Sequence, residues 1–125
     1  MHYIIYCTLT GTITRDTITQ TNTYVNIASV VLGEGNVSNT TWFIEYQCML
    51  NKVNTNNQNI FISNTINGGN ANLPKMSCLT TSSNQTFRLT GMVRVTSGST
   101  MYINIYTSLL NQTLQLAFIQ ATRIA

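Results

Sequence analysis

The side chains that could perform acid–base or metal chemistry are few and widely separated in this sequence. The histidine is His2, and the carboxylates are Asp16, Glu34 and Glu45. Proton transfer needs an acid or base within hydrogen-bond reach of the reacting group, and a serine or cysteine nucleophile needs a neighbouring base. A carboxylate pair for glycoside chemistry would form only if the fold brought these residues together. We therefore expect no enzyme activity and assign no catalytic residue.

The three cysteines, Cys7, Cys48 and Cys78, indicate neither a disulfide framework nor a metal centre. Their number is odd, they show no CxxC spacing, and a terminal histidine does not complete a ligand set. Cys48 falls within an apolar alternation, where a thiol usually packs as a small hydrophobe. We expect no metal site and no cofactor.

Charged residues are scarce, and threonine and asparagine take their place. Only 7% of the residues are charged, against about a quarter in typical soluble domains, whereas Thr occurs 21 times and Asn 16 times. These short side chains lose less rotamer entropy on ordering than Lys or Arg, so they suit packed subunits or a sugar-like ligand. Drift in an Asn-rich proteome is the alternative explanation.

The net charge of +3 is spread along the chain rather than concentrated. No two of the six cations are adjacent, and the nearest approach to a basic patch is Arg88 with Arg94 on one expected strand. Nucleic-acid binding favours a basic patch interleaved with aromatic residues. We therefore expect no nucleic-acid partner.

The sequence shows no recognisable targeting or membrane segment. The apolar stretch at residues 3–9 is too short for a signal peptide with proper flanks, and no run approaches membrane-spanning length. We expect no signal peptide, no membrane insertion and folding in a reducing compartment. A charge-poor surface rich in Thr and Asn suits exposure, and a virion component assembled in the host cytoplasm meets both conditions.

Four Asn-x-Ser/Thr sequons begin at Asn36, Asn39, Asn84 and Asn111. Chance supplies several sequons in a chain so rich in these residues. Without a signal peptide, we interpret the four asparagines as turn residues rather than glycan sites.

Apolar and polar residues alternate through most of the chain, and no long window has helical spacing. We predict a single all-β domain over residues 1–125, an antiparallel β-sandwich folded as a jelly roll of eight or nine strands. The expected strands include residues 23–32, 40–50, 60–63, 76–81, 86–96, 100–107 and 113–125, and the expected polar loops are residues 51–59 and 65–74. The Thr-rich strands of residues 1–22 are interpreted as an assembly or attachment segment.

Two residues within these strands have expected packing roles. Trp42 shares its parity with apolar residues and is expected in the core. Gly91 lies in mid-strand, which indicates a bulge or a close backbone approach.

The last expected strand is apolar on both of its faces, so it needs two partners. One parity, with Leu114, Leu116 and Phe118, is assigned to the domain's own core. The other parity is assigned to a neighbouring subunit together with two tyrosines of the preceding strand, and this predicted subunit interface comprises Tyr102, Tyr106, Ala117, Ile119 and Ala121. Tyrosines on a solvated sheet are the alternative.

The order of these segments resembles a known family from about residue 23 to the end. A strand ending in a Gly-rich loop (residues 23–35), an aromatic strand (residues 40–50), residues 87–95, the turn at residues 97–102 and a closing apolar strand are similar to the jelly-roll heads of the tumour necrosis factor and complement globular-head superfamily. The sequence motifs, including the last residues 121–125, are more similar to those of phage fibre tips and of surface proteins of large DNA viruses. The resemblance implies a homotrimer packed around a threefold axis. Ser99 stands where the animal members have an acidic residue, and their glycine in the last strand is missing.

Two functions follow as expectations. The first is a structural virion protein, a small trimeric jelly roll that contacts copies of itself and other virion proteins in a capsid surface, vertex, decoration or fibre head. The alternative is a lectin-like module without catalysis that binds a host glycan or receptor. In that case the loops at residues 51–59 and 65–72 would present amides, and Trp42 or Tyr24 would stack on a sugar, although the alternation favours Trp42 as a core residue.

Overall fold

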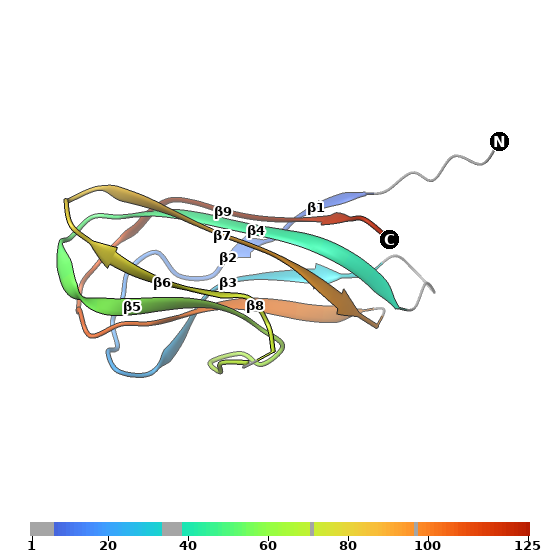
Figure 1. Ribbon diagram of the computed structural model, residues 1–125, viewed down its shortest axis with the longest axis horizontal. Coiled ribbons are helices and arrows are strands. Elements are labelled where there is room, and N and C mark those ends of the chain that lie inside the picture. Colours follow the sequence, from blue (N-terminus) through green and yellow to red (C-terminus); the bar gives the residue numbers. More distant parts are fainter. Residues whose placement is uncertain (1–6, 34–38, 71, 97) are drawn as a thin grey trace.

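The computed structural model describes residues 7–33, 39–70, 72–96 and 98–125 and shows a sandwich of two antiparallel sheets (Figure 1). The nine strands of these residues are β1 (Thr8–Thr10), β2 (Thr12–Ile13), β3 (Tyr24–Leu32), β4 (Thr40–Leu50), β5 (Asn54–Ser63), β6 (Lys75–Thr80), β7 (Gln85–Val95), β8 (Ser99–Tyr106) and β9 (Leu114–Arg123). The four-stranded sheet has the order β1-β9-β4-β7, and the five-stranded sheet has the order β2-β3-β8-β5-β6.

The strand pairs are nested along the chain. β1 pairs with β9, β3 with β8, β4 with β7, and β5 with β6, all antiparallel. A nested set of this kind corresponds to one long β-hairpin that folds over on itself, and this is the connectivity of a jelly roll. The predicted fold class is therefore confirmed. Strand β1 brings the N-terminal part of the described chain beside β9, close to the C-terminus (Figure 1).

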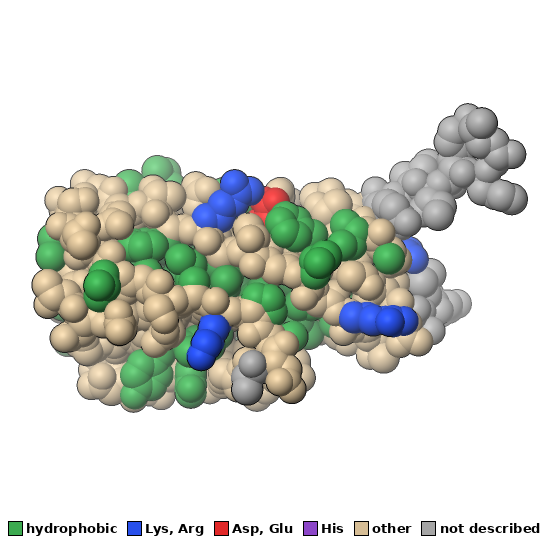
Figure 2. Space-filling model, viewed as in Figure 1, with side chains coloured by type: hydrophobic (Ala, Val, Ile, Leu, Met, Phe, Trp, Pro, Cys, Tyr) green, Lys and Arg blue, Asp and Glu red, His purple; other side chains and the backbone are tan. Residues whose placement is uncertain are grey.

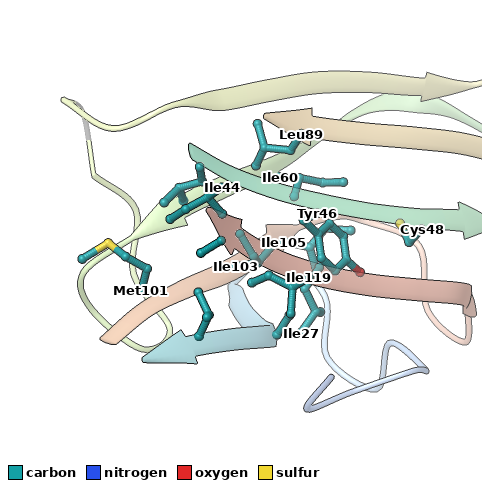
Figure 3. Packing of buried hydrophobic residues seen from close by; sticks show 14 of the residues in the cluster. Ile27, Ile44, Tyr46, Cys48, Ile60, Leu89, Met101, Ile103, Ile105 and Ile119 are labelled. Carbon is teal, nitrogen blue, oxygen red and sulfur yellow. The ribbon is translucent and has the colours of Figure 1, made fainter. Parts of the chain in front are cut away.

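The core follows from the period-2 alternation of the strands. In β4, every second residue from Thr40 to Leu50 is buried, and the residues between them are only half-buried. Trp42 lies fully inside, as predicted, and its indole Nε1 donates a 2.7 Å hydrogen bond to Oγ1 of Thr40. Figure 3 shows side chains of β3, β4, β8 and β9 meeting between the sheets, among them Ile27, Tyr46 and Ile119.

The prediction of a polar loop at residues 51–59 was wrong over most of its length, because β5 begins at Asn54. Asn54 and Gln58 point inward and are buried despite their amides. The hydroxyl of Thr107 accepts a hydrogen bond from Nδ2 of Asn54 (3.5 Å) and donates one to Oε1 of Gln58 (2.9 Å). These hydrogen bonds to Thr107 offset part of the cost of burying two amides, although Nε2 of Gln58 has no partner among the described residues. The predicted loop at residues 65–74 is confirmed as a connection between β5 and β6.

Two glycines allow the edges of the sandwich to close. Gly11 lies between β1 and β2, where the chain passes from one sheet to the other, and a Cβ there would lie 2.3 Å from the carbonyl oxygen of Ser29. A Cβ on Gly91 would lie 2.3 Å from Cγ of Pro74, so the predicted close approach is confirmed. The interpretation of residues 1–22 as an attachment segment stays a prediction, and residues 1–6 lie outside the described chain.

Candidate functional surfaces

The closing strand β9 contains a β-bulge at Leu116. Phe118 pairs with Gln47 and Gln115 pairs with Met49, so two residues of β9 stand opposite one residue of β4. Leu116 has a left-handed backbone conformation with φ of 51°. One extra residue in the ladder reverses which parity of the strand faces the core.

Because of the bulge, the predicted assignment of β9 residues to the core or to a neighbouring subunit was wrong for four residues. Ile119 and Ala121 are buried in the chain's own core, at 1% and 0% exposure, and were wrongly assigned to a neighbouring subunit. Leu116 and Phe118 were wrongly assigned to the core, because they are 79% and 37% exposed. Leu114, which precedes the bulge, is a core residue as predicted, and Ala117 packs partly buried against the core.

The two tyrosines of the predicted interface lie on the other sheet. Tyr102 and Tyr106 belong to β8 and stand on the outer face of the five-stranded sheet, because the core-facing residues of β8 alternate with them. Tyr106 packs edge-on against Tyr24 with ring centroids 5.3 Å apart, and Tyr24 packs in the same way on Phe61. The structure therefore does not bring the tyrosines together with Ala117, Ile119 and Ala121 as one surface.

A different surface collects the apolar residues that face outward from β4, β7 and β9. We call it the four-strand face, and its members with apolar side chains are Phe43, Met49, Met92 and Phe118. We count Leu116 with it, because this exposed bulge residue lies in the chain between Gln115 and Phe118, which face outward. Met92 is 64% exposed and pairs directly with Phe43. Leu116 also borders a hollow of about 560 Å³ beside Ile13 and Ala117.

The centre of the four-strand face is polar but internally neutralised. A carboxylate oxygen of Glu45 accepts hydrogen bonds from Arg88 (2.6 Å) and from Nε2 of Gln120 (3.1 Å). The Glu45 side chain is only 15% exposed, so most of its charge is satisfied within the chain. Figure 2 shows that charged side chains are sparse on the visible surface and that green apolar side chains lie among uncharged ones. The face thus offers apolar contact area around a paired carboxylate, and Arg94 is an outward-facing cation near the end of β7.

A second candidate site is a groove between the loop before β6 and the end of β7. We call it the amide groove, and it has a volume of about 550 Å³. Its polar lining consists of Asn64, Asn70, Asn72, Arg94, Thr96, Ser99 and Thr100. Its apolar lining consists of Leu73, Val93, Val95 and Met101. A concave site with an apolar base and a few convergent polar groups is typical of ligand binding.

The loop that forms one wall of the amide groove is held by buried amides. Nδ2 of Asn104 is fully buried and donates to the carbonyl oxygens of Thr65 (3.0 Å) and Gly68 (2.6 Å). The backbone amide of Asn26 donates to Oδ1 of Asn67 at 3.1 Å. Asn67 has a left-handed φ of 59°, which asparagine tolerates better than most residues. The loop is therefore anchored to β3 and β8 rather than only to its own ends.

The residues proposed for sugar binding are only partly brought together. Asn70 and Asn72, in the predicted loop at residues 65–72, line the amide groove. Trp42 is buried and cannot stack on a ligand, and Tyr24 belongs to the aromatic cluster on the five-stranded sheet. Arg94 was not predicted, since its proximity to the loop depends on how the two sheets stack and leaves no signal in the sequence.

The acidic residues and thiols of the described chain form no recognisable reaction centre. Asp16 accepts a hydrogen bond from Thr17, Glu45 is occupied on the four-strand face, and His2 and Glu34 lie outside the described residues. Within the described ranges, no three His, Cys, Asp or Glu residues gather as metal ligands would. No helix in this part of the protein is long and apolar enough to cross a membrane.

Burial governs the chemistry of the internal thiols. It raises the pKa of the Cys78 thiol to about 11 and that of the Cys48 thiol to about 12. Burial, followed by the nearby Cys48, also raises the pKa of the Tyr46 phenol well above its ordinary value. Because the thiolate is the nucleophilic form, Cys48 and Cys78 are poorly reactive in the native protein.

The fold and these surfaces define a jelly-roll β-sandwich with a partly apolar sheet face and an amide-lined groove. No protein-family description matches the chain, and no curated protein matches it. The functional argument therefore depends on the two surfaces themselves.

Proposed function

We propose that this protein is a structural, non-catalytic subunit of a virus particle that associates as a homotrimer through the four-strand face. The trimer and the virion role follow the resemblance to the tumour necrosis factor and complement globular-head superfamily. The contact surface is a revision, because Ile119 and Ala121 fill the core and are not available to a neighbour. In this proposal Leu116, Phe118 and Met92 replace them.

The observation that carries the proposal is the conformation of Leu116. A left-handed backbone costs a non-glycine residue about 1–2 kcal/mol, and burial of its side chain does not offset this cost, since 79% of the residue is exposed. Backbone outliers that persist without local compensation occur mainly at functional sites. Contact with a second copy would bury the Leu116 side chain and supply the missing stabilisation.

The composition of the chain supports an assembled role. The outward residues of β4 and β7 are mainly Thr, Gln and apolar side chains, and Glu45 is already paired with Arg88. Among these ladder residues, Arg94 near the end of β7 is the cation that association would have to leave in contact with water. Cys48 and Cys78 are buried thiols, which is compatible with folding in a reducing compartment before assembly.

Sedimentation velocity at micromolar concentration tests the trimer. We expect a trimer for the unaltered chain and a weaker one for Leu116→Gly, which removes the side chain but retains a residue suited to the left-handed conformation. Phe118→Ser should act in the same way. Each change should raise the dissociation constant by about tenfold or more, in the range for a central interface residue. Circular dichroism should remain that of a β protein.

The matched control is Val31→Ser, because Val31 is 60% exposed on the outer face of the five-stranded sheet. This change should leave the trimer intact. A monomer for the unaltered chain, or full trimers for both Leu116→Gly and Phe118→Ser, would overturn the proposed contact. The virion role requires that the chain be found by mass spectrometry in purified particles, and its absence from them would refute that role.

A further inference from the structure

We infer that the amide groove binds an acidic saccharide, with Arg94 taking the carboxylate and the asparagine amides taking sugar hydroxyls. The groove lies at the edge of the sandwich between β7 and the loop before β6, and the hydrogen bonds that hold that loop lie within one chain. Arg94 faces outward from β7, two residues from Met92 of the four-strand face, so binding and association are measured separately. The shape of the groove, its unused hydrogen-bond donors and its positive charge support the assignment.

The shape of the groove suits a short saccharide. Its volume of about 550 Å³ falls within the range of roughly 300–1,000 Å³ that is common for small-molecule sites. Contacts within the chain hold described residues on both sides of the groove. Leu73 packs against the core, and the opposite turn is held by Oγ of Ser99, which donates to the carbonyl oxygen of Thr96 at 2.8 Å. These contacts reduce the ordering that binding would require of Leu73 and Ser99.

The amides around the groove are positioned with donors to spare. Oδ1 of Asn70 accepts hydrogen bonds from Oγ of Ser63 (2.7 Å) and from the backbone amide of Asn64 (3.2 Å). Because these bonds use only the oxygen, the Nδ2 group of Asn70 remains available as a donor. Asn72 and Thr100 make no side-chain hydrogen bond to the described residues, so their polar groups are also available. Several donors and acceptors in a small space, with the Asn70 amide held by two hydrogen bonds, suit the hydroxyls of a sugar.

The positive charge of Arg94 indicates a negatively charged ligand. It is an exposed residue of the groove and has no ion-pair partner in the part of the chain that the structure describes. No acidic side chain is among the residues that line the groove. A guanidinium can bind a carboxylate with two parallel hydrogen bonds, which gives both attraction and orientation. The lining also lacks an aromatic side chain on which a neutral sugar would stack, so charge and hydrogen bonds must supply the recognition.

The test is a titration monitored by ¹⁵N-¹H NMR with sialyllactose, which carries one carboxylate, and with lactose as its neutral counterpart. Each is added up to about 10 mM, which would nearly saturate a site with a Kd of about 1 mM. Sialyllactose should shift the side-chain amide signals of Asn70 and Asn72 and the backbone signals of Thr96 and Thr100. Lactose should bind at least about tenfold more weakly, as expected when a charge-assisted contact is lost.

Two variants test whether sialyllactose binds in the amide groove. Arg94→Gln should weaken sialyllactose binding by about tenfold or more while leaving the NMR spectrum folded. Lys52→Gln makes the same charge change at an exposed residue outside the groove and should leave binding unchanged. Sedimentation of the Arg94→Gln variant is measured beside the titration, because Arg94 faces outward two residues from Met92. A folded trimer that no longer binds sialyllactose separates the loss of this site from the loss of the trimer.

Four results would overturn the inference. They are no shift with sialyllactose, equal affinity for lactose, binding that survives Arg94→Gln, and shifts of the same size with acetate alone. The last would reduce the groove to a simple anion site. Selective binding of sialyllactose that is lost with Arg94 supports it.

Discussion

Burial and backbone conformation determine the properties of several individual residues in this chain. The sequon asparagines Asn39, Asn84 and Asn111 all have left-handed φ angles between 56° and 61°, which agrees with the prediction that they serve as turn residues. Asn36 lies outside the described residues. Buried groups such as Cys48 and Tyr46 instead have their proton affinities raised, because a charged form would lose its hydration.

The raised thiol pKa values predict a loss of stability in alkaline solution. In the unfolded chain a thiol ionises near its ordinary pKa of 9.0, whereas Cys78 and Cys48 keep their protons up to about 11 and about 12 when folded. Below pH 9 both states are protonated and this contribution is fully present. As the pH rises from about 9 towards these folded values, the free energy of unfolding should fall by about 1.4 kcal/mol per pH unit for each thiol.

Urea unfolding between pH 8 and about pH 11 measures this slope. The double variant Cys48→Ala with Cys78→Ala should be less stable at neutral pH because it leaves cavities, but its stability should decline less steeply above pH 9. Tyr46, whose pKa is also raised, leaves a residual slope above its ordinary pKa in both proteins. Identical slopes for the two proteins would show that the thiols do not contribute.

At the level of strands, the alternation in the sequence predicted where most strands lie. It predicted wrongly which residues of β9 face the core. Strands β3, β4, β7 and β8 agree with expectation within about one residue, since long alternating runs signal them clearly. The face reversal in β9 comes from a bulge at a leucine, and neither Gly nor Asn marks the position. β5 was missed at its start because its inward amides bond to Thr107, which lies 49 residues from Gln58 in the sequence.

The candidate surfaces were less predictable than the strands for the same physical reason. The aromatic face of Tyr102 and Tyr106 was read correctly as opposite to the core, but the sheet to which each strand belongs is set by the nested pairing. The loop amides of the groove were anticipated, whereas Arg94 was not, because it reaches the loop only after the two sheets stack.

The crossover between β1 and β2 predicts that Gly11 tolerates no side chain. A Cβ there would lie 2.3 Å from the Ser29 carbonyl oxygen and 2.7 Å from Cγ2 of Ile119, and the first of these is backbone that cannot move alone. The amide of Gly11 also donates to the Ile119 carbonyl oxygen at 3.0 Å, so the segment cannot shift outward without loss. Gly11→Ala should lower the free energy of unfolding by about 3 kcal/mol.

Urea unfolding of Gly11→Ala beside Thr12→Ala provides the comparison. Thr12 is the exposed next residue, so its replacement should cost less than about 1 kcal/mol. If the two variants were equally stable, the sheets could not be held as closely at this edge as the distances require.

At the scale of the whole molecule, the proposed contact face and the amide groove meet at β7, where Met92 belongs to one and Arg94 to the other. The four-strand face presents Leu116, Phe118 and Met92, and its acidic centre is already paired, whereas the amide groove depends on the unneutralised Arg94. A protein that assembles through one surface and binds through another can present several copies of the groove, which would strengthen weak binding to a surface with many ligands.

The different chemistry of the two surfaces predicts different responses to salt. Burial of apolar area is little affected by sodium chloride, so the dissociation constant of the trimer should change by less than about threefold between about 0.05 M and about 0.5 M salt. Binding of sialyllactose should weaken by about tenfold over the same range, because the contact between Arg94 and the carboxylate is exposed and screened. Sedimentation and NMR titration at both salt concentrations measure the two effects in the same samples. A trimer that dissociated in salt would place charged residues, rather than Leu116 and Phe118, at its centre.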